Sequence, residues 1–181
     1  MKGKTTLILI LLFLLLFSGI YFIDIKRSET QSRLAALEMR LFTTPIDSVV
    51  SCSIKNPKSE IVLHQESGKW VITSPIQTLA DPNAVVENLT SILEIKIERK
   101  IHTTVVDLND YGLAEPRGEF QFTTINNKTF QLTIGNENPT GDFLYVQSKG
   151  SGDIALVSKS LWNSVNIKPY DLRDRNLMHI K

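Results

Sequence analysis

Residues that could perform catalysis or bind a metal are scattered along the sequence. The three histidines, His64, His102 and His179, are far apart and form no H-x-x-x-H or similar pair. Cys52 is the only cysteine, so the sequence predicts no structural zinc site and allows no internal disulfide. The apolar alternation around Cys52 indicates a small buried side chain. No metal-binding residue is predicted.

Serines, glycines and acidic residues give no stronger signal. The serines lack the G-x-S-x-G context of a nucleophile elbow. The polar loop at residues 135–141 has neither the lysine nor the following helix of a phosphate-binding loop. Asp107, Asp110 and Glu115 have the chemistry of a glycosidase acid pair, but nothing in the sequence fixes their separation. We therefore expect no catalytic residue, no cofactor and no enzymatic activity.

Three aromatic residues remain as candidate contacts for a ligand or a partner: Trp70, Tyr111 and Tyr145. Trp70 begins a predicted strand, where its large ring is more simply a core anchor than a stacking platform. Exposure separates the two interpretations, because a ligand site needs aromatic rings clustered in a groove.

An uncharged, mostly apolar run at residues 7–23 predicts a transmembrane helix. Its 17 residues follow Lys2 and Lys4 and precede Lys26 and Arg27. With the two preceding threonines it would rise about 26–29 Å as a helix, enough to cross a hydrocarbon core of about 30 Å. A cleaved signal peptide is the alternative. The run exceeds the usual 7–15 residues of such a peptide and no A-x-A-like site follows, so we favour an uncleaved anchor.

The sequence is thus divided into an anchor (1–27), a juxtamembrane helical stalk (28–44) and one folded domain (45–181). The basic residues near the anchor, counted alone, favour a cytoplasmic domain. Long domains, however, translocate largely regardless of charge, and the N-terminal lysines resemble the basic start of an export signal. We therefore expect the domain to be extracytoplasmic.

Composition limits the partners. The formal net charge is +1, with basic and acidic residues interspersed. Nucleic acid is not an expected partner, because binding phosphates needs a concentrated basic face. About 140 residues remain after the anchor, which is the size of one domain with a single core.

The hydrophobic period predicts the elements of this domain. Leu34, Leu37 and Leu41 share one face of a helix over residues 28–42, which we expect to pack on its own domain rather than on a partner. Alternation then predicts strands at 49–54, 60–65 and 69–73, the last two joined at Ser67-Gly68. Asp81 and Pro82 open a helix whose apolar face carries five residues. They are Val85, Val86, Leu89, Ile92 and Leu93.

The second half repeats the pattern of strands and turns. A helical turn within residues 107–116 is stopped by Gly112. Strands are predicted at 95–101, 119–124, 128–134, 143–147 and 154–158, with the polar loop 135–141 and a short helix at 159–165. The fold class is α+β, with a mixed, mainly antiparallel sheet of about eight strands and one main packed helix, preceded by one transmembrane helix.

Several ordered segments resemble a known family. They are Leu41-Phe42, Gly68-Lys-Trp-Val-Ile-Thr-Ser-Pro75, Ala80-Asp81, Asp107-Leu-Asn-Asp-Tyr-Gly-Leu113 with Pro116, Thr133-Ile-Gly135, Tyr145-Val146 and Asp171-Leu-Arg-Asp174. Together with the basic start and the anchor, they are similar to the bacterial family called domain of unknown function 4340. The resemblance implies an envelope protein anchored in the inner membrane, encoded beside permease and accessory components of gliding-motility-type ABC transporters. It supplies no catalytic residues.

Three functions follow as hypotheses. The first is a non-enzymatic, membrane-anchored accessory or scaffold subunit of an envelope ABC-type transporter complex, with a periplasmic domain and with Leu12 and Leu16 as candidate contacts to permease helices. The alternative is a binding module for an envelope glycan or peptide. An envelope hydrolase is a third possibility, and it would need acidic or nucleophilic side chains that converge in a pocket.

Overall fold

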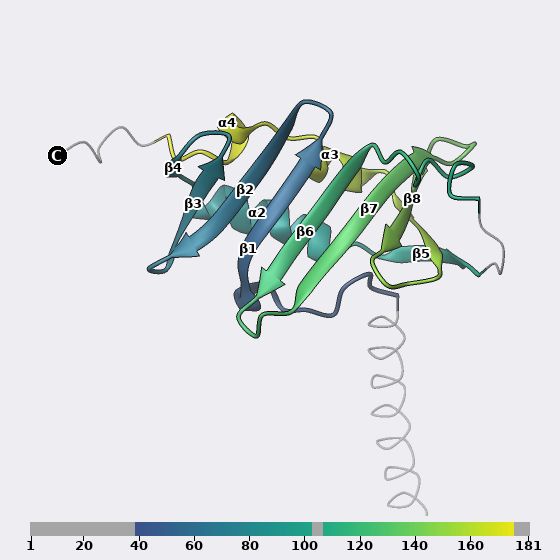
Figure 1. Cartoon of the computed structure of the whole chain (residues 1–181), viewed down its shortest axis with the longest axis horizontal. Helices are drawn as coiled ribbons and strands as arrows, with labels where there is room; N and C mark the ends of the chain where they lie inside the picture. The colour runs from purple at the N-terminus through teal and green to yellow at the C-terminus, as the bar shows by residue number, and fades with distance from the viewer. Residues whose placement is uncertain (1–38, 103–106, 176–181) are drawn as a thin grey trace, which may run out of the picture. The chain divides into compact units, whose positions relative to one another are not determined.

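The computed structural model describes residues 39–102 and 107–175 (Figure 1). The predicted anchor and most of the predicted stalk lie outside these residues. From Arg40 onward the chain forms one compact unit with an α+β fold. Within the part of the chain that the structure describes, no helix combines the length and the apolar character that a bilayer crossing needs.

In these residues nine strands form a single open sheet. The strands are β1 Val49–Asn56, β2 Ser59–Glu66, β3 Lys69–Ser74, β4 Thr78–Leu79, β5 Ile97–Ile101, β6 Gly118–Thr124, β7 Thr129–Glu137, β8 Phe143–Ser148 and β9 Ile154–Ser158. Their order is β4-β3-β2-β1-β6-β7-β8-β9-β5. Every pairing between these strands is antiparallel. The prediction of a mainly antiparallel sheet is therefore confirmed, but the prediction that the sheet is mixed is wrong.

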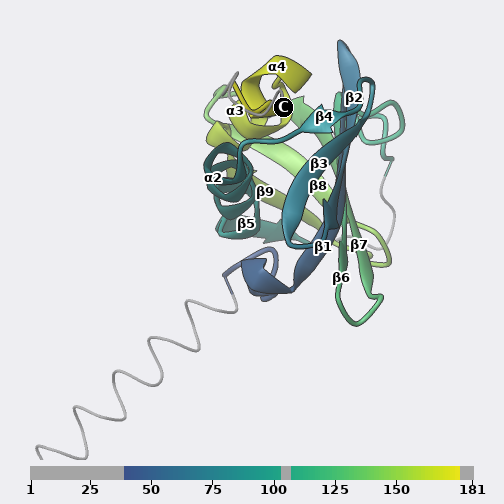
Figure 2. The same cartoon turned by 90° about the vertical axis from the view of Figure 1, so that its left-hand side faces the viewer.

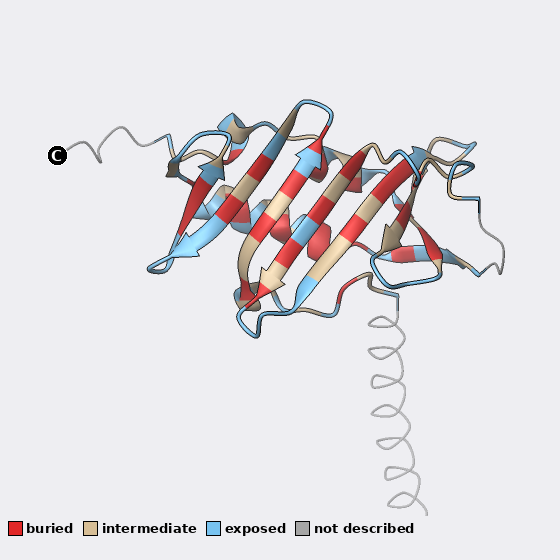
Figure 3. Ribbon diagram, viewed as in Figure 1, coloured by how far each residue is buried: buried red, intermediate tan, exposed pale blue. Residues whose placement is uncertain are grey.

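The helical elements are η1 Ile46–Ser48, α2 Pro82–Leu93, α3 Ser160–Val165 and α4 Pro169–Leu172. Figure 2 shows α2, α3 and α4 on the same side of the sheet. The strand residues that face them are buried, whereas their neighbours on the other face are mostly half-buried or exposed, which gives the alternating bands in Figure 3. The core therefore lies between the helices and one face of the sheet.

Cross-strand pairs explain why the central strands align in this register. Ile54 of β1 lies opposite Ile61 of β2 and Phe120 of β6, while Cys52 lies opposite Leu63 and Phe122. A shift by one residue would turn these buried side chains toward solvent. The hydrophobic period thus fixes the register of β2, β1 and β6.

The predicted start of α2 is confirmed. The Asp81 carboxylate accepts hydrogen bonds from the backbone N–H groups of Asn83 (2.9 Å) and Ala84 (3.5 Å), and Pro82 occupies the first helical turn. The predicted apolar face is correct except at Val86, which is 45% exposed. Val86 follows Val85 by one position and so points about 100° away from the buried stripe.

The predicted helix over residues 28–42 does not extend to its expected end. Arg40 instead forms an antiparallel bridge with Lys96, and the Leu41 N–H donates to the Ile95 carbonyl oxygen at 3.2 Å. Phe42 is 5% exposed and its ring packs edge-on against Phe122, with ring centroids 5.1 Å apart. These tertiary contacts outweigh the helical pattern at residues 40–42.

One strand boundary and two short elements also differ from the prediction, whereas the turn at residues 107–112 agrees with it. β7 continues through Glu137, so the first residues of the predicted 135–141 loop are strand. The two-residue strand β4 and the short helix α4 carry no periodic signal and were not predicted. The segment from Asp107 to Gly112 forms hydrogen-bonded turns, and Gly112 ends them with a φ of 66°.

Candidate functional site

Trp70 is buried, as the core interpretation predicts. It lies on β3, is 7% exposed, and its carbonyl oxygen accepts a hydrogen bond from the N–H of Ala80 at 2.9 Å. One side of the residue borders a hollow of about 450 Å³ that also contacts Leu79 and Asp81. Because Asp81 already caps the free amides of α2, the helix end presents no unpaired N–H groups of Asn83 and Ala84 to this hollow.

Tyr111 and Tyr145 form an edge-to-face pair, with ring centroids 4.8 Å apart. Both are half-buried. Tyr145 comes from β8, and Tyr111 comes from the turn segment that follows β5. The pair therefore joins this segment to the outer face of the sheet, and aromatic pairs of this geometry stabilise such contacts by about 0.5–1.5 kcal/mol.

Backbone contacts hold the same segment against β7. The Asn136 N–H donates to the Tyr111 carbonyl oxygen at 2.8 Å. A β-carbon built on Gly135 would collide with that carbonyl oxygen and would lie 3.1 Å from Cγ of Leu113. Only glycine at position 135 allows the two backbones to approach so closely. The Tyr-Gly-Leu segment at 111–113 and the glycine at 135 thus serve one structural contact.

A similar contact fixes the other end of the sheet. The Asp81 N–H donates to the Leu172 carbonyl oxygen, and the Asp174 N–H donates to the Leu79 carbonyl oxygen, at 2.9 and 3.0 Å. Ala80 also forms an antiparallel bridge with Arg173. The Ala-Asp and Asp-Leu-Arg-Asp segments are therefore neighbours in space, although about 90 residues separate them.

The structure does not bring the three candidate aromatic residues together. Trp70 lies on β3, and strands β2, β1, β6 and β7 separate it from Tyr145 on β8. Tyr111 pairs with Tyr145 on the far side of these strands. The sheet therefore offers two separate places, a hollow beside Trp70 and a half-buried tyrosine pair, rather than one groove lined by all three rings.

Charged side chains form one cluster that the sequence did not reveal. Glu137 accepts hydrogen bonds from Nζ of Lys159 at 2.7 Å and from the Arg117 guanidinium at 3.0 Å. The Arg117 guanidinium also lies 4.7 Å from the ring centroid of Trp162. The hydrogen bonds from Lys159 and then Arg117 lower the pKa of Glu137 below its ordinary value. An acid held ionised and paired on both oxygens is suited to bracing the fold rather than to proton transfer.

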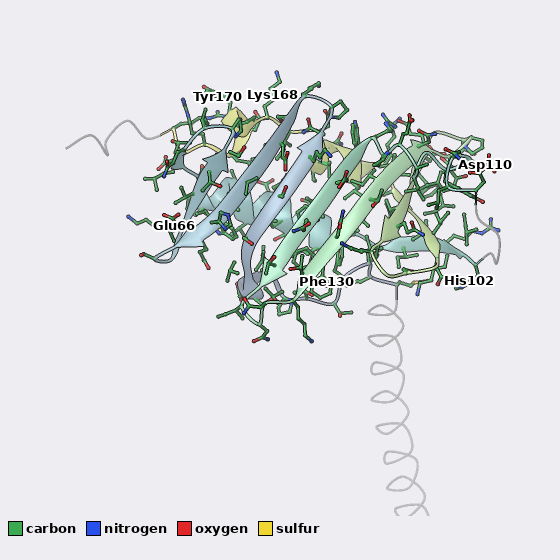
Figure 4. The ribbon with its side chains drawn as sticks, viewed as in Figure 1. Glu66, His102, Asp110, Phe130, Lys168 and Tyr170 are labelled. Carbon is green, nitrogen blue, oxygen red and sulfur yellow. The ribbon has the colours of Figure 1, made fainter. Side chains whose placement is uncertain are left out.

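The remaining candidates lie apart from this cluster. Asp107 accepts a hydrogen bond from the Asn109 N–H at 2.9 Å and closes a local turn, while Asp110 and Glu115 are exposed. His64 is exposed on β2. Figure 4 places His102 and Asp110 at the opposite end of the sheet from Glu66.

The remaining candidates are the other two histidines and the cysteine. His102 Nδ1 lies 2.8 Å from Oδ1 of Asp153, and both side chains are substantially exposed. His179 lies outside the described residues. Cys52 is buried as predicted, and burial raises the pKa of its thiol to about 12. Among residues 39–102 and 107–175, no three His, Cys, Asp or Glu side chains gather closely enough to hold a metal ion.

Comparison with known proteins identifies the class of protein. Residues 70–181, more than half of the chain, match the family described as Domain of unknown function (DUF4340). The chain belongs to this family. No curated protein and no solved structure matches the chain. The matched range contains both contacts described above, at Gly135 and at Ala80-Asp81.

Proposed function

We propose that this protein is a membrane-anchored, non-enzymatic accessory or scaffold subunit of an envelope ABC-type transporter complex. The observation that carries the proposal is the uncharged run at residues 7–23, with basic residues on both sides. Such a run is long enough to remain in a bilayer and to hold the following domain at its surface. In this role the domain is extracytoplasmic, on the periplasmic side of a bacterial inner membrane.

The contacts within the domain support a binding or scaffolding role. Several segments that resemble the family serve the fold: Gly135 and Tyr111 join a turn to the sheet, and Asp81 joins α2 to the segment at 172–174. The Glu137 carboxylate is engaged by Arg117 and Lys159. A sheet braced by such contacts at β7 and at its β4 edge would present a fixed surface to a neighbouring subunit.

Two measurements on the full chain test the proposal. After cell fractionation, we expect the protein to stay in the membrane pellet through alkaline carbonate extraction. Affinity purification after mild solubilisation should recover a permease and an ATPase. A matched variant carries an unrelated single-pass anchor in place of residues 1–27. If it still recovers the transporter, the domain makes the contact, whereas loss of recovery assigns it to the anchor, including Leu12 and Leu16. Extraction by carbonate, or recovery of neither component with the natural chain, would contradict the proposal.

A second function, binding of an envelope peptide or glycan, is favoured by the hollow beside Trp70. Trp162 is the only other tryptophan, so a Trp162→Phe variant makes Trp70 the sole indole reporter. Binding in the hollow should shift its emission on titration with a peptide or an oligosaccharide. Leu79→Lys, at the border of the hollow, should abolish the shift. An unchanged spectrum with both probes would remove this candidate.

A further inference from the structure

A hollow of about 250 Å³ lies at the point where the chain enters the domain. Its floor is apolar and is formed by Ile97 of β5, Val146 of β8 and Ala155 of β9, all of them buried. Arg40 and Lys100 stand at its border. An apolar floor beneath two cations is the arrangement that an amphipathic anion needs.

The border also offers a hydroxyl group without a partner. Among the described residues, the side chain of Ser148 makes no hydrogen bond and Lys100 makes neither a hydrogen bond nor an ion pair. Arg40 contacts Glu94 through an N–O distance of 3.6 Å, but both side chains are exposed. Exposed pairs of this kind contribute little, so the Arg40 guanidinium can exchange this partner for another anion.

One acid borders the same hollow and opposes an anion there. Asp153, from the β8–β9 connection, lines the hollow together with the two cations, and its Oδ1 is 2.8 Å from Nδ1 of His102. The N–H of Asp153 donates to the Ser151 hydroxyl at 3.1 Å. The contact with His102 orients the Asp153 carboxylate, which keeps its negative charge and opposes the attraction of the two cations for an anion.

The charge near the hollow differs from the charge of the domain as a whole. The described residues contain 14 Lys and Arg against 16 Asp and Glu, so the domain as a whole is not attracted to an anionic surface. Near the hollow the four cations Arg40, Lys96, Arg99 and Lys100 stand against the three acids Glu94, Glu98 and Asp153, which leaves a small positive excess at this end of the sheet. Electrostatic attraction to an anionic bilayer would therefore act on this end of the sheet.

The length of the tether allows contact with the bilayer. Arg40 follows Ile23, the end of the uncharged run, by 17 residues. Even a fully extended chain of this length reaches no more than about 60 Å, and a compact one reaches much less. The hollow thus remains within reach of lipid headgroups whenever residues 7–23 cross the membrane.

We propose that this hollow binds the headgroup phosphate of an anionic phospholipid, with Arg40 and Lys100 paired to the phosphate oxygens and Ser148 donating a hydrogen bond. The first methylene groups of the acyl chains would lie on the floor formed by Ile97, Val146 and Ala155. The inference rests on the proposed function, because it takes the lipid from the membrane that holds the anchor. Binding would orient the domain, with β5 toward the bilayer.

The test uses the purified full chain in a mild detergent, analysed by native mass spectrometry during titration with phosphatidylglycerol or phosphatidylcholine. The natural chain should retain one phosphatidylglycerol in preference to phosphatidylcholine. The double variant R40Q/K100Q should lose roughly 10–30-fold of this affinity. The matched control K58Q/K128Q removes the same charge at exposed positions away from the hollow and should retain the preference.

Every outcome of this test either supports or overturns the proposed lipid site. If R40Q/K100Q retains as much phosphatidylglycerol as the control K58Q/K128Q, the proposed site is overturned. Both variants keep the lysines and arginines beside the anchor, so any lipid attraction to those residues is the same in both. Displacement of the lipid by millimolar inorganic phosphate would show a free-phosphate site instead and would overturn the lipid assignment. Unchanged tryptophan emission of R40Q/K100Q excludes misfolding. Lipid selectivity is measured in detergent, so a protein that fails to fractionate with membranes or to recover a transporter contradicts the proposed function without affecting this result.

Discussion

The contact between the Tyr111 segment and β7 predicts an unusual sensitivity at one glycine. In the Gly135→Ala variant, the added methyl group would occupy the position of the Tyr111 carbonyl oxygen and press on Leu113. A backbone atom cannot rotate out of the way as a flexible side chain can. We therefore expect the segment at 107–113 to separate from the sheet.

The cost follows from the contacts that are lost. Separation removes the hydrogen bond between Asn136 and Tyr111, worth about 0.5–1.5 kcal/mol. It also exposes part of Leu113, now 5% exposed, where full burial contributes about 1.5–3 kcal/mol. With partial relaxation of the segment, the free energy of unfolding should fall by about 2–4 kcal/mol.

Two other glycines provide matched controls. For Gly112→Ala the three atoms nearest to the added β-carbon all belong to the Asn136 side chain, which can rotate away, so the main cost is that of the left-handed φ of 66°, about 1–2 kcal/mol. A β-carbon on Gly152 meets no atom within 4 Å, so Gly152→Ala should change stability by less than about 0.5 kcal/mol. The expected order of damage is thus Gly135, Gly112, Gly152.

The assay is urea unfolding of the full chain in a mild detergent, followed by tryptophan fluorescence. Both tryptophans, Trp70 and Trp162, lie in the domain, so the signal reports on its unfolding alone. For an m value near 2 kcal/mol per M, the midpoint of Gly135→Ala should fall by about 1–2 M. A midpoint for Gly135→Ala that equals that of Gly152→Ala would refute the reasoning.

Three further outcomes are expected. Asp81→Ala removes the cap of α2 and should lower the unfolding free energy by about 0.5–2 kcal/mol, whereas Asp110→Ala, at an exposed position, should leave the urea midpoint unchanged. Because the pKa of Glu137 is lowered, its pairs stabilise the fold fully above the unfolded pKa of about 4.3, and this contribution is lost as the pH falls through the lowered pKa. In the Glu137→Gln variant, the urea midpoint should therefore depend less on pH on the acid side. An unchanged slope of midpoint against pH would contradict this. Because the pKa of the buried Cys52 thiol is raised to about 12, the folded chain should not react with iodoacetamide at pH 8, and labelling should appear only in urea; rapid labelling without urea would show that the thiol is accessible.

The elements that depend on neighbouring residues could be predicted from the sequence. Alternation at residues 49–54 and the turn at Ser67-Gly68 predicted β1 and the β2–β3 hairpin, since side-chain period and turn conformation are local properties. Asp81 and Pro82 predicted the start of α2 for the same reason. The order of motifs also led to the family to which the chain belongs.

Local pattern failed where distant contacts compete with it. Residues 40–42 leave the predicted helix because they contact distant residues instead: Arg40 bridges Lys96, the Leu41 N–H donates to Ile95, and Phe42 packs on Phe122. β7 continues past Ile134 because the bulged pairing with β8 resumes at Glu137. A period read from ten residues contains no information about such partners, which are supplied by other strands of the sheet.

The sequence by itself determined the uncharged run, the strands and helix of regular period, and the burial of Trp70 and Cys52, because hydrophobicity and turn chemistry are properties of adjacent residues. Only the tertiary structure decided which side chains meet. The Glu137 cluster joins positions 117, 137 and 159, and the hollow beside Arg40 joins the start of the domain to β5, β8 and β9. The order of strands in the sheet makes these residues neighbours, and that order depends on pairings between segments far apart in the chain.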